Sequence, residues 1–206
     1  MKEPARALVL AAALALAAGV AAEERSPVRS LREIRQHNVI VQRWDASCGA
    51  AALATVLTYH IGQRVSEKAV AEAMLGRTDP LRVKVRGGFS LLDLKRYAER
   101  AGFVADGYAQ VPLEELDDLQ PAIVPVVFFG FPHFVVYRGR IGQQVLLADP
   151  AYGNRLLEVE KFVEAWQNIA FVVTRPKDSA AQKRPRIELQ DYIRASPEAI
   201  RSAVSR

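Results

Sequence analysis

The sequence predicts an α+β fold, in which an N-terminal helical part is followed by an antiparallel β-sheet. Apolar residues at helical spacing are confined to the first half of the chain, whereas the second half contains short apolar runs separated by Gly, Pro and polar turns. Several connections between these runs are short, and short connections join only antiparallel neighbours. The 206 residues, of which 50% are hydrophobic and 25% charged, are enough for one domain with a hydrophobic core.

Residues 1–22 have the order of a secretory signal peptide. Lys2 and Arg6 precede a continuous apolar run, and small residues end the run before Glu23. The run is shorter than the roughly 20 residues that span a bilayer, which favours a cleaved signal over the alternative, an uncleaved N-terminal membrane anchor. In either case we expect the folded part to lie in the periplasm.

Three further segments are expected after the signal peptide. Residues 23–38 are charged and lack a clear period, so they predict a leader segment or a short helix. Residues 39–175 form the predicted domain, which begins with a short strand-like approach at residues 39–41. Residues 176–206 are basic and have little apolar content, which is typical of a flexible tail.

The first predicted helix of the domain is buried. Residues 49–59 are rich in Ala and Leu and contain no Gly or Pro after Gly49, which predicts about three helical turns. Asp45 or Ser47 is expected to be its N-cap, and Cys48 then falls in the first turn.

Two more helices are expected at residues 66–75 and 90–101, because each range begins with a serine and carries apolar residues at helical spacing. In the second range, Ser90 and Asp93 have the spacing of a capping box. The intervening residues 78–88 are polar and contain Pro and Gly-Gly, so they predict a loop.

Short apolar runs in the second half predict the strands of the sheet. They are residues 123–129, 134–137, 145–147 and 170–173. A helix over residues 161–166 is expected between the last two strands.

The charge distribution argues against a nucleic-acid partner. The formal net charge is +5, but residues 1–22 carry +1 and residues 175–206 carry +4, so the charges of residues 23–174 cancel. No zinc-finger spacing or aromatic-rich basic motif is present. A nucleotide is not expected either, because no Gly is followed by Lys and the chain therefore has no P-loop.

Cys48 is the one cysteine, so no disulfide can form within the chain. In an exported protein, a free thiol is either buried and inert or used for chemistry. At the first turn of a helix, the unpaired N–H groups and the partial positive charge stabilise a thiolate. Cys48 is therefore a candidate nucleophile, and the alternative is a structural thiol in an Ala-rich helix.

A cysteine nucleophile needs a base, usually a histidine oriented by a carboxylate or an amide. His37 lies in the charged leader, and His60 lies about 18 Å along the helix from Cys48, which is too far to reach the thiol. His133 begins a predicted strand. If residues 133–138 and 144–149 pair as a hairpin, His133 and Asp149 meet at the same open end.

An oxyanion that develops on a substrate carbonyl needs hydrogen-bond donors. The amide of Gln42, six residues before Cys48, can supply one donor together with the backbone N–H of Cys48.

Three segments together resemble the peptidase C39 family, the bacteriocin-processing cysteine peptidases: residues 42–53 (QRWDASCGAAAL), 133–137 (HFVVY) and 149–153 (DPAYG). The resemblance covers about residues 39–174. It implies a papain-like fold whose helical part carries Cys48 as nucleophile and whose sheet carries His133 as base and Asp149 as its orienting residue. It also implies that Gln42 lies in the oxyanion hole and that cleavage follows a Gly-Gly leader sequence.

The sequence departs from many family members in two ways. Ser47 stands where many members have Asp directly before the cysteine. Many members are also the N-terminal domain of an ATP-driven exporter, whereas here we expect a signal peptide and find no ATPase motif. The chain is therefore more similar to stand-alone exported members, such as the peptidase of functional-amyloid secretion systems of Gram-negative bacteria.

The expected function is a cysteine peptidase that processes an exported protein or peptide, such as a secreted amyloid subunit or a leader peptide, with a membrane secretion complex as a further partner. This chemistry requires neither a metal nor a cofactor. One alternative is a non-catalytic C39-like module that binds a peptide for a secretion machine. Another is an acyltransferase or transglutaminase-like reaction at the same cysteine.

Overall fold

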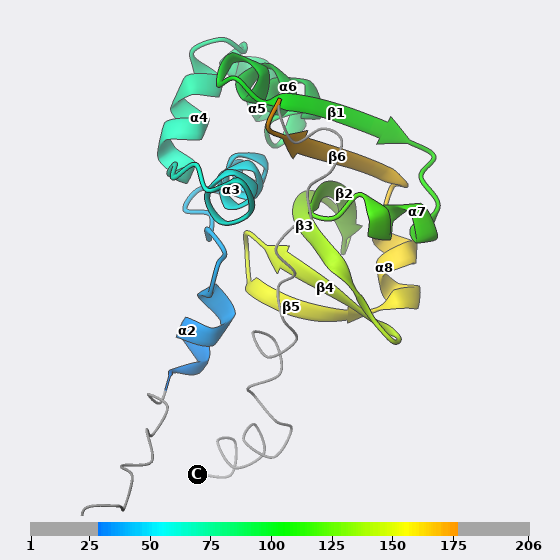
Figure 1. Ribbon diagram of the computed structural model, residues 1–206. Coiled ribbons are helices and arrows are strands. Elements are labelled where there is room, and N and C mark those ends of the chain that lie inside the picture. Colours follow the sequence, from blue (N-terminus) through cyan, green and yellow to red (C-terminus); the bar gives the residue numbers. More distant parts are fainter. Residues whose placement is uncertain (1–28, 177–206) are drawn as a thin grey trace, which may run out of the picture.

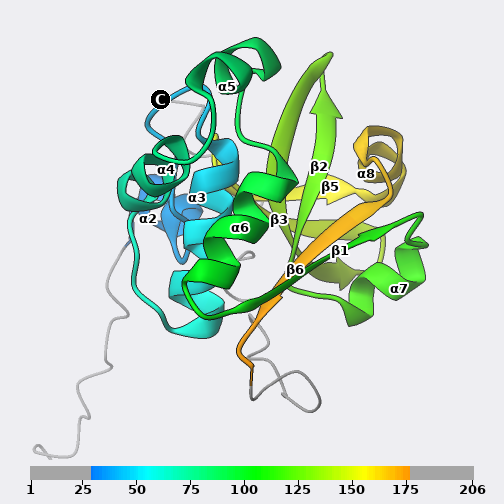
Figure 2. The same ribbon diagram turned by 90° about the horizontal axis from the view of Figure 1, so that it is seen from above.

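The structure, a computed structural model, describes residues 29–176 and has three layers (Figures 1 and 2). The predicted signal peptide, the first part of the leader and the predicted tail from residue 177 onward lie outside the described residues. The helices are α2 (Leu31–Gln36), α3 (Cys48–Thr55), α4 (Glu67–Leu75), α5 (Pro80–Arg86), α6 (Leu91–Arg100), α7 (Leu113–Asp118) and α8 (Val159–Ala165). A π-helical segment, η1 (Val56–Ile61), continues α3.

The strands form a six-stranded antiparallel sheet in the order β1-β6-β2-β3-β4-β5. They are β1 (Val104–Ala109), β2 (Ala122–Phe128), β3 (Phe131–Ile141), β4 (Gln144–Asp149), β5 (Gly153–Glu158) and β6 (Ile169–Thr174). Figure 2 shows α3, α4 and α6 on one side of this sheet and α7 and α8 on the other. The predicted α+β order, helices first and an antiparallel sheet second, is confirmed.

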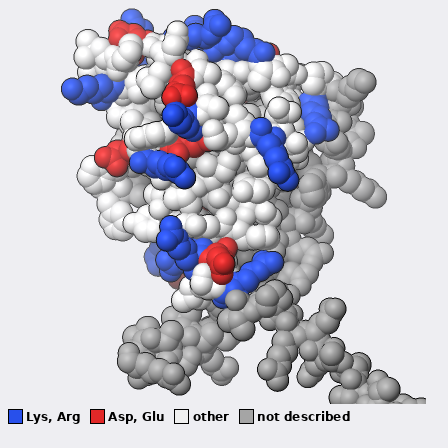
Figure 3. Space-filling model, turned by 90° about the vertical axis from the view of Figure 1, so that its left-hand side faces the viewer, with Lys and Arg blue, Asp and Glu red and all other residues white. Residues whose placement is uncertain are grey.

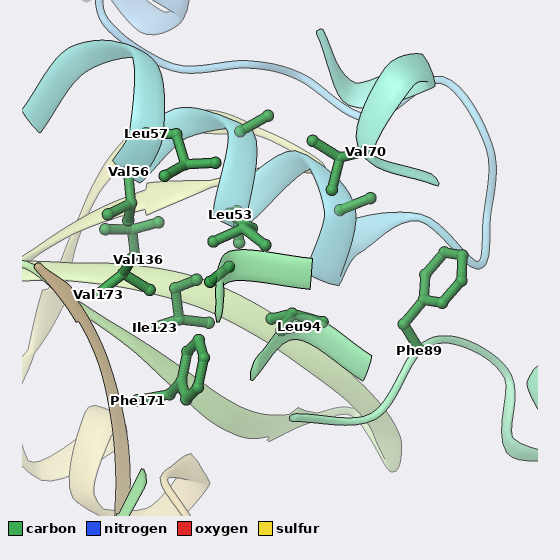
Figure 4. Close-up of a cluster of buried hydrophobic side chains, with 14 of the residues drawn as sticks. Leu53, Val56, Leu57, Val70, Phe89, Leu94, Ile123, Val136, Phe171 and Val173 are labelled. Atoms are coloured by element: carbon green, nitrogen blue, oxygen red, sulfur yellow. The ribbon is translucent and has the colours of Figure 1, made fainter. Parts of the chain in front are cut away.

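The main core lies between α3 and the sheet. All eight residues of α3 are buried, because its small Ala side chains let neighbouring elements approach on every side. Figure 4 shows side chains of α3 and η1 directed toward those of the sheet. The helical side contributes Leu53, Val56 and Leu57, and the sheet contributes Ile123, Val136, Phe171 and Val173.

A second core fills the other face of the sheet. Its centre is a row of aromatic rings in which Phe162 lies 5.5 Å from Tyr137 and 5.5 Å from Trp166, measured between ring centroids. Along β3, Val136 faces the main core while Val135 and Tyr137 face the second core. The sheet is therefore covered on both faces, which explains why its central strands are nearly continuous apolar runs.

The helices predicted at residues 66–75 and 90–101 are confirmed as α4 and α6. The prediction of a loop over residues 78–88 is wrong, because these residues contain α5. Pro80 occupies the first turn, where its missing N–H costs nothing, and Asp79 accepts a hydrogen bond from the N–H of Leu81 at 2.9 Å. Gly87, with φ of +76°, ends the helix.

Residues 39–41 do not form the predicted strand. Individual hydrogen bonds hold this segment instead: the Ile40 N–H donates to Thr55 Oγ1 at 3.0 Å, and the Gln42 N–H donates to the carbonyl of Pro150 at 2.8 Å. Besides α5, three elements were not predicted, namely β1, β5 and α7. The strands β1 and β5 are the two edges of the sheet, and their exposed faces carry polar residues that interrupt any apolar run.

Positive and negative charges are unevenly distributed within residues 23–174, the part of the chain whose charges cancel. Residues 62–103, which form α4, α5 and α6, contain nine Lys or Arg and five Asp or Glu, whereas residues 104–174 contain four and nine. On the face of the molecule that carries α4, Lys and Arg outnumber Asp and Glu (Figure 3). Within residues 29–176, no helix is long and apolar enough to cross a membrane.

Candidate active site

Cys48 is buried and is the first residue of α3, one residue earlier than predicted. Ser47 occupies the N-cap position, but its side chain does not cap the helix. Its hydroxyl instead contacts Glu67 Oε1 at 2.5 Å and the carbonyl of Trp44 at 2.6 Å. Ser47 is thus the N-cap residue, as one of the two expected candidates, but it makes no capping hydrogen bond, and the first N–H groups of α3 remain available beside the thiol.

Gly49 explains how the start of α3 comes close to β3. A Cβ atom at Gly49 would lie 3.1 Å from Leu94 and 3.2 Å from Phe134, which is tighter than ordinary contact. The absence of a side chain therefore lets the helix rest on the ring of Phe134, the residue after His133. Because Cys48 precedes Gly49, the thiol is brought beside the imidazole of His133.

His133 and Asp149 contact each other, with His133 Nε2 at 2.8 Å from Asp149 Oδ1. The hairpin predicted for residues 133–138 and 144–149 is confirmed by the pairing of β3 with β4. Val136 pairs with Ala148, so His133 reaches Asp149 diagonally and not from the directly opposite position.

The surroundings of His133 favour its protonated form. Burial disfavours the charged imidazolium, but the hydrogen bonds to Asp149 and Cys48 outweigh it and raise the pKa of His133 to about 9. An imidazolium next to a thiol favours the thiolate by its charge. The site therefore holds a positively charged imidazolium beside the side chain of Cys48.

Asp149 is fully buried and carries the opposite charge. Burial alone would raise the pKa of its carboxyl, but the hydrogen bond and charge of His133, the N–H of Ala151 and the charge of Arg155 hold this pKa below its usual value. Arg155 Nη1 lies 3.1 Å from Asp149 Oδ2. Sequence reasoning missed Arg155, since β5 itself was not predicted.

Gln42 lies beside this site but its side-chain amide is engaged. Nε2 donates to the carbonyl of Trp44 at 3.0 Å and lies 3.4 Å from the carbonyl of Asp45. Its backbone N–H holds Pro150, the residue after Asp149. A donor role toward an oxyanion therefore requires one amide N–H to leave the longer contact with Asp45.

The other two histidines lie elsewhere. His60 belongs to η1, beyond the end of α3 that is remote from Cys48. His37 follows α2, where its carbonyl accepts a hydrogen bond from Asn154 Nδ2 at 2.7 Å.

Four exposed aromatic side chains lie near these residues in sequence. Trp44 precedes Cys48 by four residues and Tyr152 follows Asp149 by three. Phe129 lies in the β2–β3 turn, and Phe131 is the first residue of β3, two positions before His133. Phe129 is 97% exposed and has a φ of +52°, an uncommon conformation for an aromatic residue. Aromatic side chains at these positions provide apolar surface on the loops that carry the candidate catalytic residues.

The sequence model of the peptidase C39 family matches residues 36–178. The chain belongs to this family. It is 42% identical over 147 residues to the probable functional amyloid protease FapD of Pseudomonas aeruginosa, a match that covers 71% of the chain. The match spans 64% of the length of that relative.

Two solved structures of C39 peptidases are similar to the chain. One is a double glycine motif protease from an AMS/PCAT transporter in complex with the leader peptide, with 29% identity, a TM-score of 0.55, and coverage of 66% of the chain and 89% of that protein. The other is the peptidase domain of Streptococcus ComA, with 23% identity, a TM-score of 0.56, and coverage of 66% and 97%. The predicted papain-like fold of the C39 family is therefore confirmed.

Proposed function

We propose that this C39 family member is a cysteine endopeptidase that cuts an exported protein or peptide in connection with functional-amyloid secretion. The observation that carries the proposal is the hydrogen-bonded pair of His133 and Asp149 next to Cys48, the first residue of α3. A thiol, an imidazole and a carboxylate in this order are the groups that a cysteine peptidase needs. The similarity to the probable functional amyloid protease FapD supports the connection with amyloid secretion.

In the first half of the proposed reaction, the Cys48 thiolate attacks the carbonyl carbon of the scissile bond. A C–S bond forms, and the π electrons of the carbonyl move to its oxygen. The oxyanion accepts hydrogen bonds from the Cys48 N–H and from one N–H of Gln42, once that group leaves the carbonyl of Asp45. The C–N bond then breaks, the imidazolium proton of His133 goes to the leaving amine, and a thioester remains on Cys48.

Water completes the proposed reaction. The neutral His133 takes a proton from the water that attacks the thioester carbon, the C–S bond breaks, and Cys48 leaves as a thiolate. The product is a carboxylic acid, and the thiolate–imidazolium pair is restored. Throughout, the bond between Asp149 and His133 Nε2 leaves Nδ1 as the nitrogen that faces the thiol.

For the substrate, we propose a polypeptide cut after a Gly-Gly pair, either a leader peptide or an amyloid subunit. The similar double glycine motif protease, crystallised with a leader peptide, supports this choice. Glycine residues before the scissile bond would let the substrate backbone approach the buried Cys48 closely. The exposed Trp44, Phe129 and Tyr152 would then contact flanking side chains.

For the location, we propose the periplasm, reached through the signal peptide at residues 1–22, with the chain anchored in the membrane if that peptide is not cleaved. Mass spectrometry of the N-terminus of the chain purified from periplasmic and membrane fractions tests this proposal. A chain that begins near residue 23 in the periplasmic fraction supports it. Recovery from the cytoplasm alone, with residues 1–22 intact, contradicts it.

The proposed activity is tested by comparing exported proteins from cells that carry native Cys48 or Cys48→Ala. We expect one peptide bond that is cut in native cells to stay intact in the variant, and the residues before it test the Gly-Gly preference. His37→Asn, which changes a histidine outside the Cys48–His133–Asp149 set, is the matched control and should cut normally. If the exported proteins of the Cys48→Ala cells are cut at all the bonds that are cut in native cells, the proposal is contradicted.

Alkylation of the purified chain separates a peptidase from a non-catalytic peptide-binding module. Beside the imidazolium of His133, Cys48 should react with iodoacetamide at pH 6 at least tenfold faster than free glutathione does. His133→Asn should remove this advantage. A rate equal to that of glutathione, together with peptide binding without cleavage, would favour the binding module.

A further inference from the structure

The buried carboxylate of Asp149 receives hydrogen bonds at both of its oxygens. Oδ1 lies 2.8 Å from His133 Nε2 and 2.8 Å from the N–H of Ala151, and Oδ2 lies 3.1 Å from Arg155 Nη1. The side chain of Asp149 is only 1% exposed, so water contributes little to its solvation. Arg155 is the partner whose charge does not depend on pH, because a guanidinium stays protonated throughout the pH range in which proteins are folded.

The position of Arg155 follows from the pairing of β4 with β5. Arg155 is paired with Leu147, and Leu147 and Asp149 point to the same face of β4 because alternate residues of a strand share a face. The guanidinium carbon lies 4.8 Å from the centre of the Phe128 ring and 5.4 Å from that of Tyr152. Contact with two aromatic rings restrains a long side chain and orients its N–H groups toward Asp149.

The charged and titratable groups around Asp149 come from two neighbouring strands. Within residues 29–176, those that face its carboxylate are His133 from β3 and Arg155 from β5. Cys48 lies next to His133, and Tyr152 lies next to Arg155. Without Arg155, the imidazolium of His133 and the N–H of Ala151 would remain to oppose the cost of keeping this buried carboxylate charged, and Oδ2 would lose its charged partner. A protonated Asp149 would lose its charge-assisted bond to His133, and the imidazole would no longer be held toward the thiol.

We propose that Arg155 is a positioning residue of this site, which keeps the Asp149 carboxylate ionised and oriented so that His133 stays in place at mildly acidic pH. Arg155 acts through Asp149 and does not contact the thiol. The inference rests on the proposed function in one respect, since the orientation of His133 matters to catalysis only if Cys48 is the nucleophile.

The test follows the hydrogen bond between His133 and Asp149 directly. In the full chain, the proton on His133 Nε2 is observed by NMR as the pH is lowered, because its downfield resonance persists only while Asp149 is ionised. In Arg155→Met, which keeps an apolar stem but no charge, we expect the midpoint for loss of this resonance to rise by about 1 pH unit or more. Arg155→Lys, which keeps the charge, should recover at least half of that shift.

Arg140→Met is the matched control. Arg140 also pairs with a carboxylate, Asp117, at 2.5 Å, and its side chain is 26% exposed compared with 28% for Arg155. It lies toward the other end of β3 from His133, so the control should titrate like the native chain. An unchanged midpoint in Arg155→Met, or an equal shift in Arg140→Met, would overturn the proposal.

Two further measurements keep the test decisive. If Arg155→Met does not fold, Arg155→Gln replaces it, and a native midpoint in Arg155→Gln likewise overturns the proposal. Cys48 alkylation by iodoacetamide is measured on the same samples. A slow, glutathione-like rate in the native chain contradicts the proposed peptidase, whereas a fast rate with no effect of Arg155 on the midpoint contradicts only the role of Arg155.

Discussion

Ser47 Oγ lies 2.5 Å from Glu67 Oε1, which ties the residue before Cys48 to the first residue of α4. The same carboxylate oxygen accepts a hydrogen bond from the backbone N–H of Arg43 at 2.8 Å, and Glu67 is buried. One side chain therefore holds both ends of the loop that leads to the candidate nucleophile. The carbonyl groups of this loop in turn hold the amide of Gln42.

We expect Glu67→Ala to lower the free energy of unfolding by about 2 kcal/mol, because the Arg43 N–H loses its acceptor and the buried Ser47 hydroxyl keeps only the carbonyl of Trp44. Glu67→Gln keeps an oxygen acceptor and should lose less. Urea denaturation measures both. Glu72→Ala removes an exposed carboxylate from the same helix and should cost less than about 0.5 kcal/mol, so an equal loss in Glu67→Ala and Glu72→Ala would refute the role of Glu67.

The contact between α2 and β5 predicts a strong effect at Gly153. Its φ is +89°, and a Cβ atom there would lie 2.3 Å from the carbonyl oxygen of Arg35. We expect Gly153→Ala to cost about 3 kcal/mol or more in thermal or urea unfolding, because strain and collision add. Gly142 has a φ of +56° but open space around it, so Gly142→Ala should cost only about 1 kcal/mol. Similar losses in the two variants would show that the collision with Arg35 is relieved without cost.

The close approach of α3 to β3 makes Gly49 sensitive. A methyl group at Gly49 must push back Leu94 or the ring of Phe134, and this separates Cys48 from His133. Gly49→Ala should therefore cost about 1 kcal/mol of stability and slow Cys48 alkylation at pH 6 several-fold. Gly107→Ala in β1, where a Cβ atom meets nothing within 4 Å, should change neither quantity. Native alkylation in Gly49→Ala would mean that this contact does not set the position of the thiol.

The raised pKa of His133 predicts how stability depends on pH. A group whose pKa rises on folding stabilises the folded state fully below its unfolded value, here about 6.5, and this contribution disappears as the pH rises through the folded value of about 9. Between pH 6 and pH 10 we expect a loss on the order of 3 kcal/mol in the free energy of unfolding. Urea denaturation across this range should show a clearly smaller loss in His133→Asn, with His37→Asn as the control that behaves like the native chain. Equal pH dependence in the native chain and His133→Asn would contradict the prediction.

Local sequence patterns were enough to predict the helices that begin with a capping serine and the strands that are buried on both faces of the sheet. Ser66 and Ser90 are the N-caps of α4 and α6, where their hydroxyls accept hydrogen bonds from the backbone N–H groups of Ala69 and Asp93, and both serines can be recognised in the sequence. The central strands β2, β3 and β4 are apolar because helices cover both faces of the sheet. The edge strands β1 and β5 carry no such run, and α5 begins with a proline that also occurs in loops.

The candidate site divides in a similar way. Cys48, His133, Asp149 and Gln42 can be selected from residue type and spacing, because a helix start and a hairpin are local features. Arg155 and Glu67 have no local signal, since each acts on a residue brought to it by packing: Arg155 through the pairing of β5 with β4, and Glu67 through the contact of α4 with the start of α3.

The sequence by itself thus determined the α+β fold class, with helices before an antiparallel sheet, the lone thiol at a helix start and a body whose charges cancel. Only the tertiary structure decided which charges face one another. It places His133 between Cys48 and Asp149, and sets Arg155 against the far oxygen of that carboxylate. The physical reason is that helix and strand preferences depend on neighbours along the chain, whereas hydrogen bonds and charge interactions depend on distances of a few ångströms that only packing establishes.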